Sequence, residues 1–240
     1  SQIEKERMKY VKLTDRLLKI ASLVDNGKRI ADIGTDHGYI PVYLLNQNKI
    51  QYAILGDVNK GPLENARKEV TRNKLQDKVD LRLGSGIEVL KENEVDEIII
   101  AGMGGMLINN LLKANEKIAH TTEKLILQPM QAPEELRMFL YQNGYKILDE
   151  HLVREEHRLY EIIVCKYEGL EPQEIDPIYY EIGLKLIQNN DPLLNDFIEN
   201  KIRINQNVLK KLEGKEGQGI EDKRAALNKK IDALNDLLNK

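Results

Sequence analysis

The chain has 240 residues, of which 41% are hydrophobic and 31% are charged, and its formal net charge is −3. This composition can supply a packed core and excludes wholesale disorder, and the length suits one large domain with or without a smaller partner. The longest apolar runs, such as Ile98–Ile100, are far shorter than the roughly 20 residues of a membrane-spanning helix.

The first 20 residues are charged and amphipathic and lack the apolar segment of a signal peptide. Six basic side chains accompany three acidic ones there, which fits either a solvated helix face or contacts with phosphate groups. The chain starts with Ser1, and Met8 is a candidate for its natural first residue. Cys165 is the only cysteine, so an intrachain disulfide and a cysteine-based zinc cluster are excluded, and we expect a reducing, cytoplasmic environment.

Short β-branched or apolar runs alternate with amphipathic stretches over the first two thirds of the chain. The runs predict seven strands, at Arg29–Ile33, Tyr52–Asp57, Val79–Leu83, Val95–Ala101, Lys124–Gln128, Tyr145–Leu152 and Tyr160–Lys166. The predicted helices include Thr14 to about Val24, Leu63–Val70, Met106–Lys117 and Pro133–Gln142. Alternation of this kind predicts an α/β fold with a parallel sheet covered on both faces. The last two strands have no helix between them and should pair antiparallel, which is the element order of a class I, Rossmann-like methyltransferase domain.

The patterning changes after Lys166, where the predicted strands stop. An acid followed by proline predicts a helix start at Asp176-Pro177 and again at Asp191-Pro192, the second helix reaching about Glu213. A last helix follows a glycine-rich turn. Apolar residues at steps of three, four and seven predict that these two helices form an antiparallel coiled-coil hairpin, with Asn205 interrupting one stripe. The predicted domains are therefore residues 1–168 and 169–240.

The first predicted strand leads into the motif Asp32-Ile33-Gly34-Thr35-Asp36-His37-Gly38-Tyr39. Glycines there let the backbone turn sharply and let a ligand approach closely. The spacing lacks the third glycine with which dinucleotide folds hold a pyrophosphate, which disfavours an NAD-dependent dehydrogenase. Acidic residues at such a turn favour a cationic ligand without phosphate, such as S-adenosylmethionine.

The next three predicted strands also end in residues suited to ligand binding. Asp57 can accept hydrogen bonds from both hydroxyls of a ribose. Small residues at Gly84-Ser85-Gly86 could hold an adenine edge, and the three glycines of 101–105 leave room for ligand and substrate to meet. The candidate cofactor-binding residues are Asp32, Gly34, Thr35, Asp36, Gly38, Asp57, Val58, Asn59, Gly84, Ser85, Gly86, Ala101, Gly102, Met103 and Gly104.

Three kinds of methyl transfer are disfavoured by what the motifs lack. The N-P-P-[YF] tetrapeptide of exocyclic-amine methylases would follow the fourth strand, where AGMGG stands. Attack on pyrimidine C5 needs a nucleophilic cysteine, and Cys165 lies within the last predicted strand. Metal-dependent catechol chemistry would need a carboxylate cluster after the fourth strand, so we expect no metal.

The motifs ADIGTDHGYIP, GDVNKGP, GSG and AGMGG, followed by LQPM and LVREEHRLYEIIV, resemble those of the bacterial tRNA (adenine-N1)-methyltransferases of the TrmK type. The resemblance covers the whole chain. It implies methylation of adenine 22 of tRNA with S-adenosylmethionine as cofactor. By the same resemblance, Tyr39 lies at the target base, and the cofactor is bound by Gly34, Asp36, Gly38, Asp57, Ser85 and Gly102.

This chemistry agrees with the residue types. Adenine N1 carries a free lone pair and can attack a sulfonium methyl group without first losing a proton, so no strong general base is needed. We expect Tyr39 to offer a ring face for stacking or cation–π contact. His37 is the second candidate catalytic residue and would bond to the base edge, with a structural role as the alternative.

Two other functions remain open from sequence. One is methylation of a small molecule, and the other is a non-catalytic RNA-binding module that keeps the cofactor fold. We expect a monomer whose hairpin grips tRNA through basic side chains on its outer surface; the alternative is a solvated helix pair that stabilises the fold or a dimer. These basic residues are Lys201, Arg203, Lys210, Lys211, Lys215, Lys223, Arg224, Lys229 and Lys230.

Overall fold

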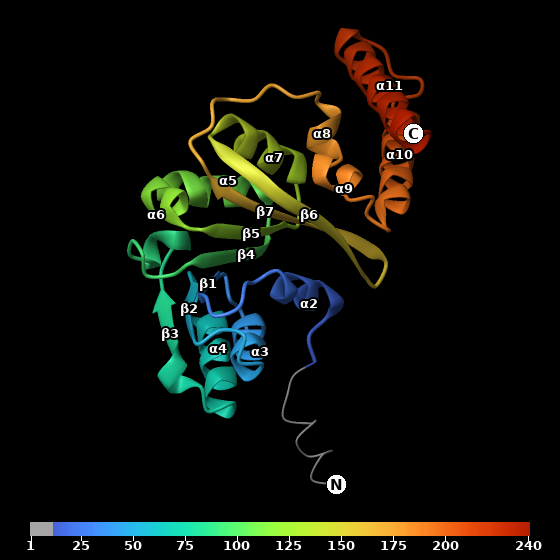
Figure 1. The fold of residues 1–240 in the computed structure, drawn as a ribbon. Coiled ribbons are helices and arrows are strands. Elements are labelled where there is room, and N and C mark those ends of the chain that lie inside the picture. The colour runs from blue at the N-terminus through green and yellow to red at the C-terminus, as the bar shows by residue number, and fades with distance from the viewer. Residues whose placement is uncertain (1–11) are drawn as a thin grey trace. The chain divides into compact units, whose positions relative to one another are not determined.

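The structure is a computed structural model that describes residues 12–240. Met8 and the basic residues before position 12 lie outside the described residues. The chain divides into two compact units, Ser1–Glu174 and Ile175–Lys240 (Figure 1). Within residues 12–240, no helix is long and apolar enough to cross a membrane.

A seven-stranded sheet with the order β3-β2-β1-β4-β5-β7-β6 forms the centre of the first unit. Its strands are β1 (Arg29–Ile33), β2 (Tyr52–Asp57), β3 (Val79–Leu83), β4 (Glu97–Met103), β5 (Lys124–Pro129), β6 (Tyr145–Glu155) and β7 (Arg158–Tyr167). The first five strands are parallel, and β7 pairs antiparallel with both β5 and β6. The predicted class I methyltransferase fold is confirmed, including the antiparallel final pair.

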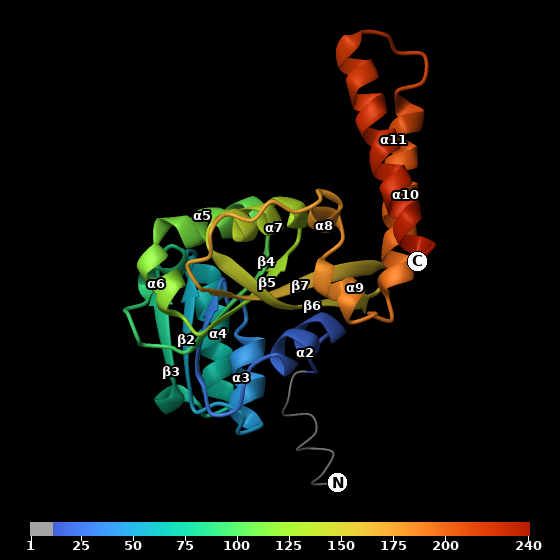
Figure 2. The same cartoon turned by 45° about the horizontal axis from the view of Figure 1, so that its top comes forward.

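Helices cover both faces of this sheet (Figures 1 and 2). One layer contains α2 (Asp15–Ser22), α3 (Tyr39–Asn46) and α4 (Lys60–Arg72), and the other contains α5 (Gly105–Ala114), α6 (Glu116–Thr121) and α7 (Pro133–Gln142). Two short 3-10 helices, Gln76–Lys78 and Gly86–Val89, flank β3. Thr14 caps α2 as predicted, since its side chain accepts a hydrogen bond from the N–H of Leu17. Each helix layer closes its own apolar cluster against the sheet.

Several predicted strands and helices differ from the structure by a few residues at their ends, and two differences in the first unit concern the fourth strand and the helix that follows it. The fourth strand begins at Glu97 and not at Val95, and the carboxylate of Asp96 just before it accepts hydrogen bonds from the backbone N–H and the guanidinium of Arg29. The single helix predicted from Met106 to Lys117 is two helices, α5 and α6. They break at Asn115, whose φ of −139° and ψ of 62° are not helical.

The second unit is helical, with α8 (Ile178–Glu181), α9 (Leu184–Gln188), α10 (Leu194–Lys211) and α11 (Gln218–Leu238). The predicted hairpin of the last two helices is confirmed, and its core contains Ile198, Ile202, Ile231 and Leu234. The helix predicted to start at Asp191-Pro192 begins at Leu194, because the Asp191 carboxylate accepts the N–H of Leu193 in a preceding turn.

Candidate active site

The carboxyl ends of β1, β2, β3 and β4 surround a cavity of about 430 Å³. β1 pairs with both β2 and β4, so the cavity lies where the strand order reverses, the usual ligand position in open α/β sheets. We call it the glycine cavity. The predicted cofactor-binding residues that line it are Gly34, Asp36, Asp57, Val58, Asn59, Gly84, Ser85, Gly86, Ala101, Gly102 and Met103. Ile33, Pro62, Leu107 and Leu111 also line it and were not predicted.

A second cavity, of about 380 Å³, shares four lining residues with the first. The shared residues are Gly34, Asp36, Ala101 and Gly102. Both predicted catalytic residues, His37 and Tyr39, line this second space, which we call the His–Tyr cavity. Most of the predicted cofactor-binding residues and both predicted catalytic residues therefore lie around two adjoining cavities. These cavities meet at the turn after β1 and at the end of β4. Asp32 and Thr35 line the His–Tyr cavity, whereas Gly38 and Gly104 line neither.

The turn after β1 is held by hydrogen bonds to β2. The N–H groups of Gly34 and Thr35 both donate to the carbonyl of Gly56, at 2.9 and 3.1 Å. Gly38 begins α3 with a φ of +69°, and a Cβ there would lie 3.0 Å from a methyl carbon of Leu55. This glycine is needed for backbone conformation and close packing, which explains why it lies outside both cavities.

Three carboxylates, those of Asp32, Asp36 and Asp57, lie around the two cavities. Asp32 is almost fully buried, and the hydroxyl of Thr35 donates to its Oδ2 at 2.9 Å. Burial raises the pKa of Asp32 to about 7, the Thr35 hydrogen bond opposes this, and the negative charges of Asp57 and Asp36 add to it. Asp57 Oδ1 accepts the N–H of Asn59 at 2.9 Å, and its Oδ2 accepts the N–H of Asp36 at 3.4 Å. Such a cluster favours a cationic ligand.

The rings of His37 and Tyr39 stack on each other, with centroids 4.9 Å apart and planes 11° from parallel. Nε2 of His37 lies 3.8 Å from Oδ1 of Asp36. One face of the Tyr39 ring is thus covered by His37, which the sequence did not predict. The other face is the one left for the stacking role expected of this tyrosine.

The three glycines between the end of β4 and the start of α5 serve different purposes. Gly102 has a φ of +77°, and a Cβ on Gly102 or Gly104 would meet open space. A Cβ on Gly105 would lie 2.2 Å from the carbonyl oxygen of Ala132, and its N–H donates to the carbonyl of Gln131 at 2.7 Å. The expectation that all three glycines make room for a ligand is wrong for Gly105, which makes room for the loop after β5.

Sequence reasoning missed a buried amide that braces the site. Gln128 is fully buried at the end of β5. Its Oε1 accepts hydrogen bonds from the N–H of Gly102 at 3.2 Å and from Nη1 of Arg16 at 2.8 Å, and its Nε2 donates to the carbonyl of Pro129. Arg16 comes from α2 and lines the His–Tyr cavity. The signal in the sequence was a polar side chain directly after the three apolar residues Leu125–Leu127.

Comparisons with known proteins agree with this fold. Residues 13–163 match the family model described as a methyltransferase domain. The tRNA (adenine(22)-N(1))-methyltransferase of Bacillus subtilis (strain 168) is 38% identical over 159 residues, which cover 66% of this chain and 67% of that protein. The chain belongs to this methyltransferase family. The resemblance stated from the motifs is confirmed.

Two solved structures of the family carry a bound ligand. A putative tRNA (m1A22) methyltransferase of Streptococcus pneumoniae, in complex with S-adenosyl-L-methionine, is 31% identical, with a TM-score of 0.80 over 95% of this chain and 100% of that one. TrmK of M. capricolum, in complex with the cofactor product S-adenosyl-homocysteine, is 28% identical, with a TM-score of 0.80 over 94% and 99% of the two chains.

Proposed function

We propose that this protein transfers a methyl group from S-adenosylmethionine to N1 of adenine 22 in tRNA. The observation that carries the proposal is the pair of adjoining cavities at the carboxyl end of the sheet, one lined by glycines and acids and one by His37 and Tyr39. Family membership supplies the reaction class and the substrate. Because tRNA is the substrate, we place the enzyme in the cytoplasm. We also propose that it acts as a monomer and without a metal.

The glycine cavity fits the cofactor by its donor set and its backbone. Asp57 would bind the ribose hydroxyls and Asp36 the cationic groups, with the buried Asp32 beside them at the adjoining His–Tyr cavity. Ser85 and Gly86 would lie along the adenine. The full set that we assign to the cofactor is Asp32, Gly34, Thr35, Asp36, Gly38, Asp57, Val58, Asn59, Gly84, Ser85, Gly86, Ala101, Gly102, Met103 and Gly104. Gly38 and Gly104 act through the turns that they form.

In the His–Tyr cavity the protein's task is to position the base. The bound cofactor supplies a methyl group on a sulfonium. Tyr39 stacks its free face against the adenine and so aligns N1 towards the glycine cavity. His37 supports the opposite face of Tyr39 and can bond to the base edge. Because N1 attacks as a neutral lone pair, no side chain has to remove a proton. The carboxylates around the cavities stabilise the positive charge that reaches the ring.

We further propose that residues 1–168 form the catalytic domain and that the hairpin of residues 169–240 contributes contacts to tRNA phosphates. Fewer of its basic residues are free than the sequence suggested. Lys201 and Lys230 both bind Glu181, at 3.4 and 2.9 Å, and Arg224 binds Glu221. The exposed basic residues that remain candidates are Arg203, Lys210, Lys211, Lys215, Lys223 and Lys229.

Replacing the lysines of this set by glutamine should weaken tRNA binding and flatten its salt dependence, whereas exposed Lys78→Gln should change neither.

The decisive experiment is one incubation of the protein with unmodified tRNA and methyl-labelled cofactor, followed by nucleoside analysis. We expect 1-methyladenosine, and none when position 22 carries guanine. Label in a metabolite pool but not in tRNA would support the small-molecule hypothesis instead. Cofactor binding without turnover on any substrate would support the non-catalytic module.

A further inference from the structure

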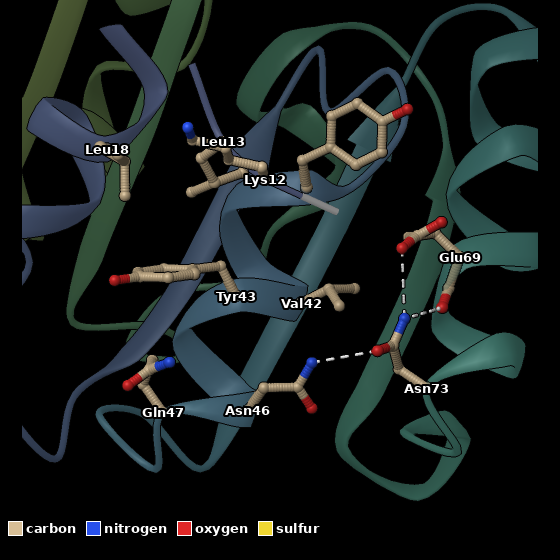
Figure 3. Close-up of a pocket in the computed structure, with 10 residues that line it drawn as sticks. Lys12, Leu13, Leu18, Val42, Tyr43, Asn46, Gln47, Glu69 and Asn73 are labelled. Atoms are coloured by element: carbon tan, nitrogen blue, oxygen red, sulfur yellow. Dashed lines mark hydrogen bonds between the residues drawn. The ribbon is translucent and has the colours of Figure 1, made fainter. Parts of the chain in front are cut away.

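A third cavity, of about 230 Å³, opens in the helix layer formed by α2, α3 and α4 (Figure 3). We call it the amide cavity. Tyr39 lines both this cavity and the His–Tyr cavity, so the side chain expected at the target base is also a wall of the third space. The methyl-transfer proposal makes no use of the amide cavity.

The polar side of the amide cavity is a chain of hydrogen bonds between α3 and α4. Nδ2 of Asn46 donates to Oδ1 of Asn73 at 3.1 Å, and Nδ2 of Asn73 donates to Oε1 of Glu69 at 3.2 Å (Figure 3). Glu69 is 5% exposed, and its Oε2 lies 3.0 Å from Nη1 of Arg72. Because Arg72 compensates the buried carboxylate, the cavity does not select a cation. A carboxamide carries two N–H donors and a carbonyl acceptor, so Asn46 and Gln47 suit the edge of a neutral heterocycle.

The other walls are apolar or aromatic. Leu13 and Val42 are buried, Leu18 is half-buried, and Figure 3 shows the Tyr43 ring beside Val42 on α3, across the cavity from Glu69 and Asn73. The volume is below the roughly 300–1,000 Å³ of cavities that hold drug-sized ligands, which suits a single ring system. Apolar walls around a small polar group match the way proteins hold an extruded base.

We infer that the amide cavity receives one unpaired nucleobase of the RNA, a near neighbour of the target adenine. This inference rests on the proposed function, because it needs an RNA substrate. Because Tyr39 lines both cavities, about one side chain would separate the two bases, a distance that nearby nucleotides can span. Lys12 is exposed and lines the cavity, where its ammonium can meet the phosphate of the seated nucleotide. The same chemistry would accept a free nucleoside, which the experiment separates.

The test combines protein variants with tRNAs that lack one base. Tyr43→Ala removes a cavity wall, and Tyr43→Phe keeps the ring. Gln47→Trp blocks the cavity from its exposed edge, and Gln51→Trp, at an exposed position that does not line the cavity, is the matched control. We expect Tyr43→Ala and Gln47→Trp to weaken tRNA binding about tenfold, as loss of one base-stacking contact does, with calorimetric cofactor affinity unchanged. Tyr43→Phe and Gln51→Trp should bind as the unaltered protein does.

The second arm uses full-length tRNAs, each abasic at one position flanking the target. One of these tRNAs should bind about tenfold more weakly to the unaltered protein, yet lose nothing further with Tyr43→Ala, because the same contact is already absent. Independent losses at every abasic position would overturn the inference. Adenosine, guanosine, cytidine and uridine are added separately as competitors. If millimolar nucleoside occupies the cavity while every abasic tRNA binds normally, the occupant is a free nucleoside and the RNA proposal is overturned.

Binding and turnover are measured separately in these experiments. If tRNA binds and the abasic effect appears but no 1-methyladenosine forms, the proposed reaction fails and the base-binding cavity stands. If methylation proceeds normally with Tyr43→Ala and with every abasic tRNA, the cavity proposal fails and the proposed reaction stands.

Discussion

The side-chain oxygen of Gln128 accepts the backbone N–H of Gly102 at 3.2 Å, and so ties the buried end of β5 to the glycine-containing end of β4. The same oxygen accepts Nη1 of Arg16 from α2. The buried Gln128 amide therefore holds both Gly102, which lines both cavities, and Arg16, which lines the His–Tyr cavity. This arrangement is a brace between three elements that are distant in the sequence.

Gln128→Leu should loosen this brace. The substitution removes the acceptor of two part-buried donors, the N–H of Gly102 and Nη1 of Arg16, and the loss of such hydrogen bonds costs about 1–3 kcal/mol in all. We expect a loss of stability in that range in urea unfolding, together with a lower kcat. Gln131→Ala, at an exposed position in the following loop, is the control and should leave both unchanged. A stable and fully active Gln128→Leu protein would contradict the brace.

Asp57→Asn should weaken cofactor binding. Both oxygens of Asp57 accept backbone N–H groups, from Asn59 and Asp36, and the amide of Asn would turn a donor towards one of them. Hydrogen bonds to a charged group contribute about 1.5–3 kcal/mol, so the dissociation constant should rise roughly 10- to 100-fold. Isothermal calorimetry measures this, with exposed Asp77→Asn as the matched control. Unchanged affinity would remove Asp57 from the ribose site.

Tyr39→Ala should reduce methyl transfer far more than cofactor affinity, because the ring lines the His–Tyr cavity and not the glycine cavity. Tyr39→Phe keeps both ring faces and should retain most of the turnover. His37→Ala removes the ring stacked on Tyr39 and should give an intermediate loss. Single-turnover rates with saturating cofactor separate the three variants. If Phe is as poor as Ala, the hydroxyl carries the function and the stacking role is wrong.

Stability should fall as the pH rises from about 4 to about 7, in part because of Asp32. Burial raises its pKa from the ordinary 3.8 to about 7, so in this window the native protein holds a proton that the unfolded chain has lost. Asp32→Asn cannot ionise, and its stability relative to the unaltered protein should increase with pH by at most roughly 1.4 kcal/mol per unit. Urea unfolding between pH 4.5 and 8 measures the difference. Glu97, whose pKa burial also raises to about 7, contributes to both proteins and cancels.

Gly105→Ala should destabilise the loops beside the active site. The added methyl group would lie 2.2 Å from the carbonyl oxygen of Ala132, a backbone atom that cannot rotate away. We expect a cost of about 1–3 kcal/mol, typical of overpacking, in urea unfolding. Gly104→Ala is the neighbouring control, because its φ is −64° and a Cβ there meets open space. Equal stability of the two variants would contradict the packing argument.

The strand series, the acidic glycine turn and the helical hairpin could all be predicted from the sequence, because each depends on local periodicity or turn chemistry. Gly34, Asp36 and Asp57 were recognisable because a turn after a buried strand needs glycine and because a carboxylate there is conspicuous. Helix α3 was missed: its apolar residues run on several sides, with Ile40, Pro41, Val42, Leu44 and Leu45 all buried, so no amphipathic period marks it.

Only the tertiary structure decided how these pieces meet. The position of β7 between β5 and β6, the stacking of His37 on Tyr39 and the bond from Gly102 to Gln128 join residues through space, and no local pattern encodes them. The three glycines between the end of β4 and the start of α5 look alike in the sequence, yet Gly105 faces the carbonyl of Ala132 while Gly102 and Gly104 face open space. A glycine's neighbours are set by the chain that packs against it, and that chain follows a different strand.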